Sequence, residues 1–368
     1  MNAIKYTMLF FAILGAVDRI IGNRFGLGKE FEKGFMMLGN MALSMIGMIV
    51  LSPWLAEILK PVFAFFSDTL QIDPSIIPAS LFANDMGGAP LAKAVALNTD
   101  IGLFNALIVS SMMGCTVSFT IPYGLGLVSP SQHREMLLGL LCGIVTIPLG
   151  CFFAGLLLYI PLSALLINLL PLIAFSLLIS IGLMLKPEVC VKIFNIFGLF
   201  IKGLITVGLI LGVIRYLTGF ELIKGLETLE EGASVCLNAA AVICGAFPLM
   251  YIVSGLLKKP VKKFAALLHV NEISVVGLIS SSATSMTTFG FMDQMDKKGV
   301  LLNCAFAVSG AFTFAGHLAF TMAFNASYLP AMILGKLSAG ILAVFLANLL
   351  SNRLLKQPEG MKANDHYQ

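Results

Sequence analysis

The sequence predicts an all-α polytopic membrane protein, and three observations point to this fold class. The composition is 58% hydrophobic and 11% charged, with a mean hydropathy of +0.95, far from that of soluble domains. Apolar runs of about 20 residues, each long enough to span a bilayer, recur along the whole chain. Two apolar stretches are interrupted by polar residues in a similar way, a pattern typical of transporter binding sites.

Nine full transmembrane spans are expected, each from an apolar run bounded by charged or turn-forming residues. Their predicted ranges are 3–21, 35–56, 101–122, 135–158, 161–185, 193–217, 234–257, 300–323 and 329–351. The first run ends at Asp18-Arg19 instead of a small-residue cleavage site, so we interpret it as a helix and not as a signal peptide. The polar linkers are short, which predicts one integral membrane transport domain, 1–351, and a polar cytoplasmic tail, 352–368.

The two interrupted stretches, Pro74–Asn98 and Ile273–Asp296, are predicted to be re-entrant or broken hairpins. Hydrocarbon offers no partner for free backbone groups, so irregular backbone survives there only inside protein or beside a wet cavity. If both hairpins re-enter, fifteen Lys and Arg side chains gather on one face and five on the other, whereas full crossing nearly removes this bias. The positive-inside rule therefore favours nine spans plus two hairpins, with the C-terminus in the cytoplasm.

An internal repeat is also predicted. Gly and Ala positions and two asparagines, Asn40 and Asn238, recur in the same order at an offset of 196 to 199 residues. The two halves are about 1–160 and 193–351, and the helix 161–185 connects them. Under the nine-span topology the halves have opposite orientations, which makes an inverted repeat whose hairpins meet near mid-membrane. Chance matching of Gly and Ala in apolar sequence is the alternative.

The first interruption, Asn84-Asp85-Met86-Gly87-Gly88-Ala89-Pro90, holds the strongest candidate for substrate binding. A carboxylate such as Asp85 is costly in an apolar segment and usually marks a pathway or a counter-ion. Gly87 and Gly88 let backbone approach a ligand, and Pro90 prevents a continuous helix. The alternative is that Asp85 and Asn84 only cap a half-helix.

The remaining candidates for the binding site are hydroxyls, amides and one imidazole. The hydroxyls either bind a ligand or bond to their own backbone. The amides either line a cavity or join helices, and His317 either relays protons or bonds to a neighbouring helix. These residues are Ser281, Ser282, Thr284, Ser285, Asn40, Asn238 and His317.

Other function classes are disfavoured by what the sequence lacks. The seven cysteines form no C-x-x-C pair, so we expect neither a metal nor a cofactor. Basic residues do not alternate with aromatics, so nucleic acid is not an expected partner. No G-x-S-x-G, P-loop or H-E-x-x-H motif occurs, so an enzyme is not expected. An intramembrane hydrolase using Asp85 and His317 is the minor alternative.

The chain resembles the EutH family, the ethanolamine permeases of bacterial ethanolamine-utilisation clusters. The resemblance covers nearly the full length. It is carried by Ala16–Ile20, Phe31–Met36, Asp85–Gly88, Leu91–Lys93, Ser111–Gly114, Gly143–Pro148, Asn303–Ser309, His317-Leu318 and Gly335–Leu337. Two departures are Ala315-Gly316-His317, where the family often has Gly-Asp-His, and the second interruption, where it tends to carry Asn and Pro.

The resemblance implies uptake of ethanolamine, a small-molecule substrate, across the bacterial cytoplasmic (inner) membrane. We expect its ammonium to face Asp85 and its hydroxyl to reach the serine-rich interruption. A secondary transporter, a uniporter, a channel-like facilitator and a carrier for another small amine stay open. Membrane lipid is an expected partner, and assembly into a homo-oligomer stays open.

Overall fold

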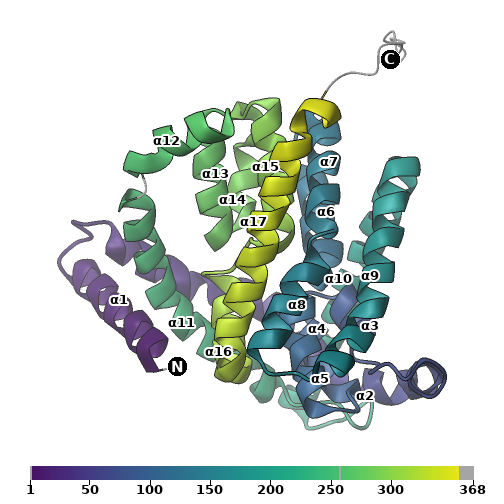
Figure 1. The fold of residues 1–368 in the computed structure, drawn as a ribbon. Coiled ribbons are helices and arrows are strands. Elements are labelled where there is room, and N and C mark those ends of the chain that lie inside the picture. Colours follow the sequence, from purple (N-terminus) through teal and green to yellow (C-terminus); the bar gives the residue numbers. More distant parts are fainter. Residues whose placement is uncertain (1, 257, 356–368) are drawn as a thin grey trace, which may run out of the picture.

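The structure is a computed structural model that describes residues 2–256 and 258–355, and all regular elements in these ranges are helical (Figure 1). The predicted tail therefore lies outside the described residues from residue 356 onward. The α-helices are α1 (Asn2–Ile20), α2 (Leu27–Leu70), α3 (Ile76–Leu81), α4 (Gly88–Val95), α5 (Thr99–Phe104), α6 (Ile121–Leu127), α7 (His133–Ile144), α8 (Ile147–Leu157), α9 (Leu162–Leu185), α10 (Pro187–Thr218), α11 (Leu229–Leu256), α12 (Lys258–Leu268), α13 (Glu272–Ala283), α14 (Ser285–Gly290), α15 (Lys297–Ser309), α16 (Gly316–Asn325) and α17 (Leu329–Leu354).

Seven helical stretches of the described chain are long and apolar enough to cross a membrane. They are Leu27–Ala64, Thr99–Leu127, Pro130–Leu157, Leu162–Leu185, Pro187–Thr218, Leu229–Leu256 and Gly316–Leu354. The chain is thus an all-α polytopic membrane protein. The predicted spans 3–21 and 300–323 correspond to α1 and to the broken pair α15–α16, so nine spans stays a prediction.

Both predicted hairpins are interrupted helices. Hairpin 1 consists of α3, the short 3₁₀-helix η1 (Asn84–Met86) and α4, and hairpin 2 consists of α13, α14 and the 3₁₀-helix η5 (Met292–Gln294). The second interruption is narrower than predicted, because Ser280–Ala283 continue α13 and only Thr284 is extended. Figure 1 shows α13 and α14 in the upper half of the molecule and α3 and α4 in the lower half.

The helices that follow the hairpins are also irregular, which the sequence does not predict. The stretch after hairpin 1 contains two π-helical segments, η2 (Asn105–Gly114) and η3 (Thr116–Thr120). The stretch after hairpin 2 is broken at 310–315, between α15 and α16. The predicted continuous span 300–323 is therefore interrupted. The irregular backbone is paired across elements, because Phe312 N donates to Ser281 O (3.0 Å) and Phe314 N to Ser282 O (2.9 Å).

Hydrogen bonds join the two ends of hairpin 1. One carboxylate oxygen of Asp73, just before α3, accepts the backbone N–H groups of Leu97 and Asn98, just after α4, at 3.0 and 2.9 Å. The other oxygen accepts Ser75 N at 3.0 Å, and Asn105 Nδ2 on η2 donates to Ser75 Oγ at 2.9 Å. These bonds form the neck of hairpin 1.

Hairpin 2 has a neck of the same design. Asn271 donates from its backbone N–H to Asp296 Oδ1 (3.0 Å) and from its side chain to Gln294 O (2.8 Å). Asn303 Nδ2 on α15 donates to Ser274 O at 2.8 Å. Asn271, Asp296 and Asn303 follow Asp73, Asn98 and Asn105 by the same 198 residues, within the predicted offset. This correspondence supports the predicted repeat.

Helices α1, α2, α10 and α11 form a layer that packs against one side of the other helices, which we call the central body. The crossing of α2 and α10 is a backbone contact, because a Cβ on Gly47 would lie 1.8 Å from Ile205 O. Against the body the layer uses side chains, such as Phe197 of α10, whose ring centroid lies 5.7 Å from that of Phe82. The layer therefore supports the tip of hairpin 1 from one side.

Candidate functional site

The tip of hairpin 1 has irregular backbone, because residues 82 and 83, between α3 and η1, belong to no helix. Phe82 is extended, and Gly87 has a positive φ of 97°. A Cβ on Gly87 would lie 1.7 Å from Met48 Cγ, so both its conformation and its space require glycine. Ser118 Oγ of η3 accepts the N–H of Ala83 at 3.0 Å and fixes the tip. The predicted residues Asn84, Asp85, Gly87 and Gly88 thus share one turn.

Asp85 is partly exposed, although Asn84 before it and Gly87 and Gly88 after it are buried. No ion pair within 4.0 Å joins Asp85 to a base in the described part of the chain. Asn84 is fully buried, and neither atom of its side-chain amide has a hydrogen-bond partner among the described residues. Unpaired polar atoms inside a membrane protein are costly, so Asn84 and its neighbour Asp85 stay candidates for binding a ligand.

The sequence did not identify Lys336 of α17 as a member of this site. Its side chain is 1% exposed, and Nζ donates to Ser111 O of η2 at 2.7 Å. Its Nζ is thus bound to η2, the segment that packs against η1, which carries Asp85. No ion pair within 4.0 Å joins this ammonium to a carboxylate among the described residues.

Some of the hydroxyls at the tip of hairpin 2 form hydrogen bonds within the hairpin. Ser281 Oγ donates to Thr288 Oγ1 (3.0 Å), and Ser282 Oγ donates to Ile279 O (2.6 Å), which fits the alternative that serines stabilise the interruption. Ser285 differs, because it is fully buried and its hydroxyl has no partner among the described residues. Thr284 is partly exposed at the interruption itself.

His317 connects the two hairpins. Its ring lies 5.3 Å from that of Phe312, whose N–H binds hairpin 2, and α16, which carries His317, packs against η1 of hairpin 1. His317 is 1% exposed, and its Nδ1 has no partner in the described residues. Ser309 and Thr321, which the sequence analysis did not single out, are also buried with unpartnered hydroxyls on either side of the break at 310–315.

The structure does not bring every predicted residue to the two hairpin tips. Asn40 on α2 and Asn238 on α11 are exposed, and their predicted part in substrate binding stays a prediction. No group of three or more His, Cys, Asp or Glu side chains in the described ranges is arranged to hold a metal ion.

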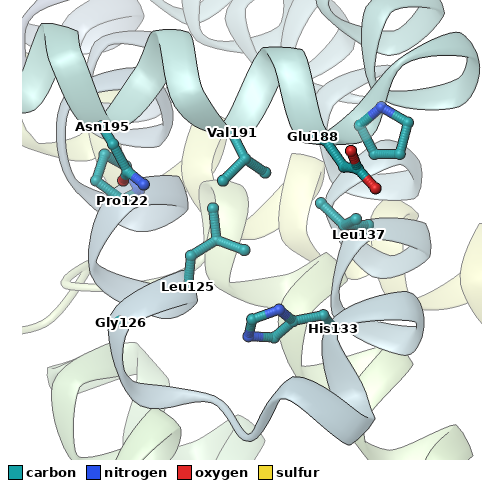
Figure 2. Close-up of a pocket in the computed structure, with 9 residues that line it drawn as sticks. Pro122, Leu125, Gly126, His133, Leu137, Glu188, Val191 and Asn195 are labelled. Atoms are coloured by element: carbon teal, nitrogen blue, oxygen red, sulfur yellow. The ribbon is translucent and has the colours of Figure 1, made fainter. Parts of the chain in front are cut away.

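Two cavities lie away from the hairpin tips, each beside a hairpin neck. The first, of about 530 Å³, lies between α6, α7 and α10; Figure 2 shows Glu188 and Asn195 of α10 across from His133 of α7. It lies near the neck of hairpin 2, because Gln132 Nε2 donates to Met292 O at 3.1 Å. The second, of about 390 Å³, is lined by Asp73, Leu97 and Asn98 of the neck of hairpin 1.

Comparison with known proteins gives a consistent result. The family described as "Ethanolamine utilisation protein, EutH" matches residues 1–350. The chain is 41% identical over 354 residues to a "Probable ethanolamine permease EutH" of Listeria monocytogenes, covering 96% of this chain and 95% of that protein. Proteins of the same name from Salmonella typhimurium and Escherichia coli are 38% and 37% identical, each over 94% of both chains. No solved structure matches.

Proposed function

Because the chain belongs to the EutH family of ethanolamine utilisation proteins, we propose that it carries ethanolamine across the bacterial cytoplasmic membrane. The observation that carries this proposal is the set of buried, unpartnered polar side chains around the two hairpin tips. The set consists of the amide of Asn84, the imidazole of His317 and the hydroxyl of Ser285, and the partly exposed carboxylate of Asp85 lies in the same turn as Asn84. A small molecule with an ammonium and a hydroxyl matches these partners.

In the proposed binding mode the ammonium of the substrate faces Asp85, and its hydroxyl bonds to His317 or to a hydroxyl near the break at 310–315. An inside-negative potential favours entry of a monocation by about 2.3 kcal/mol per 100 mV, or about fifty-fold accumulation. Uniport is therefore sufficient for uptake, and no coupling ion is required.

The test is uptake of labelled ethanolamine into proteoliposomes at acidic pH, where the amine is protonated. Asp85→Asn removes the charge and keeps the shape, so we expect uptake to fall at least about tenfold. Asp293→Asn is the matched control, because this exposed carboxylate lies at the far end of hairpin 2. Normal uptake by the Asp85→Asn protein would refute the role of Asp85.

Saturation and counter-flow in the same proteoliposomes separate a carrier from a channel-like facilitator, since only a carrier exchanges external substrate for internal substrate. Thermal stabilisation of the purified protein by a panel of small amines identifies the preferred substrate, because a ligand of the folded state stabilises it by mass action. Stabilisation by another amine, without any by ethanolamine, would shift the proposal to that amine.

A further inference from the structure

Helix α12 has a pattern that substrate transport does not use. Its sequence, Lys-Lys-Pro-Val-Lys-Lys-Phe-Ala-Ala-Leu-Leu, contains four lysines and no acidic residue. At 100° per residue the lysines fall on one half of the helix and the large apolar residues on the other. We propose that α12 lies in the membrane interface and binds the headgroups of anionic phospholipids.

The apolar half of α12 is only partly used by the protein. Val261 and Ala265 are 5% and 6% exposed and pack against Val275 of α13. Phe264 and Leu267, next to this stripe on the helix surface, are 48% and 69% exposed. Apolar side chains beside a row of lysines match the boundary between acyl chains and headgroups.

The orientation of α12 fits this location. The helix is bent by 108° relative to α13, so it lies across the entrance of hairpin 2 and not along it. Figure 1 shows α12 at the upper edge of the molecule, beside the start of α13. An interfacial helix must lie roughly in the membrane plane, and the bend from the re-entrant α13 gives this orientation.

The charge of α12 selects the kind of lipid. Lys262 and Lys263 are exposed, and neither forms an ion pair with a residue in the described ranges. Lysines held near a membrane surface attract anionic lipids and discriminate weakly among neutral ones. The expected partner is therefore a phospholipid with a net negative headgroup, such as phosphatidylglycerol.

The connection between α12 and hairpin 2 is short and fixed. Val270 N donates to Ala265 O (3.0 Å) and closes the end of α12, and Asn271, the next residue, forms the neck of hairpin 2. Lipid bound at α12 thus holds the neck of hairpin 2 at a constant depth in the bilayer.

Fluorescence quenching in vesicles tests the proposal with the full chain. The only tryptophan is replaced (Trp54→Phe) and a reporter is placed on α12 (Leu267→Trp). Brominated phosphatidylglycerol is compared with brominated phosphatidylcholine as quencher. We expect a preference of at least about fivefold for phosphatidylglycerol, which falls at high salt. A reporter at Leu166 of α9, a helix without basic residues, should show a preference near one.

Changing all four lysines to glutamine should remove the preference at position 267, and changing them to arginine should keep it. Equal quenching by the two lipids at position 267, or a preference that survives the glutamine changes, would overturn the proposal. The experiment does not involve ethanolamine, so its outcome is independent of the proposed transport function.

Discussion

Lys336 is the residue whose substitution distinguishes most clearly between models of the site. Its buried ammonium donates to Ser111 O of η2, which packs against the segment η1 that carries Asp85, and it forms no ion pair with Asp85 within 4.0 Å. In the proposed binding mode, the like charge of Lys336 repels the substrate ammonium that binds Asp85. We expect Lys336→Gln to lower KM for ethanolamine by about tenfold, which corresponds to about 1.4 kcal/mol, and to lower the maximal rate because release becomes slower. Initial rates of uptake over a range of ethanolamine concentrations measure both constants.

Lys336→Arg is the matched control, since it keeps the positive charge, and its KM should stay near that of the unmodified protein. A higher KM for Lys336→Gln would contradict this account, because it would mean that the lysine helps to hold the substrate. Normal thermal stability of both variants, measured in detergent, shows that any change does not arise from misfolding.

At the residue scale, the sequence could identify Asp85 and Asn84 because polar residues stand out in an apolar segment. It could not identify the environment of Lys336, because its partner Ser111 lies 225 residues away on a π-helical segment. The sequence also could not tell which hydroxyls of hairpin 2 have a hydrogen-bond partner and which have none. Ser281 and Ser285 are alike in the chain, yet one has a hydroxyl partner and the other has none in the described residues.

At the scale of elements, the hairpin necks explain how short re-entrant helices stay in place. Asp73 joins the two ends of hairpin 1 through charged hydrogen bonds to Leu97, Asn98 and Ser75. A hydrogen bond to a charged group contributes about 1.5–3 kcal/mol. We expect Asp73→Ala to lower the midpoint of thermal unfolding by a few degrees and to reduce uptake, and Asp73→Asn to cause a smaller loss.

The control for the neck is Asp100→Ala, an exposed carboxylate in the first turn of α5 whose side chain does not join the ends of the hairpin. Its stability should match that of the unmodified protein. If Asp73→Ala also unfolds at the normal temperature, the neck does not hold the hairpin, and packing of α3 and α4 against η2 would have to do so alone.

The elements show where prediction from sequence stops. Interruptions containing Asn, Asp, Gly and Pro were predictable because these residues disfavour continuous helix. The π-helical segments and the break at 310–315 were not, because apart from Asn105, Gly114 and Gly310 their residues are compatible with a continuous helix. Their irregularity depends on tertiary partners, such as the bond from Phe312 N to Ser281 O.

At the scale of the whole molecule, the two hairpins enter from opposite ends. The neck of hairpin 2 shares its end with the start of α7 and the end of α17, since Lys297 lies 4.0 Å from Glu135 and Arg134 donates to Leu354 O. The neck of hairpin 1 lies at the other end (Figure 1). Arg134, Lys297 and Arg353, three of the basic residues counted for one face in the sequence, lie at the end of hairpin 2. The positive-inside rule therefore predicts a cytoplasmic neck for hairpin 2.

Single cysteines on either side of each hairpin test this arrangement in cells, in a background where the partly exposed Cys190 is changed to Ala. Gln71→Cys and Leu97→Cys flank hairpin 1, His269→Cys precedes hairpin 2, and Asp293→Cys lies in η5, the last element of hairpin 2; all four positions are exposed. We expect a membrane-impermeant maleimide to label both hairpin 1 positions in intact cells, because that neck faces outward. The hairpin 2 positions should react only after permeabilisation. Labelling of His269→Cys and Asp293→Cys from different sides would mean that this segment crosses the membrane, and the predicted inverted repeat would then be wrong.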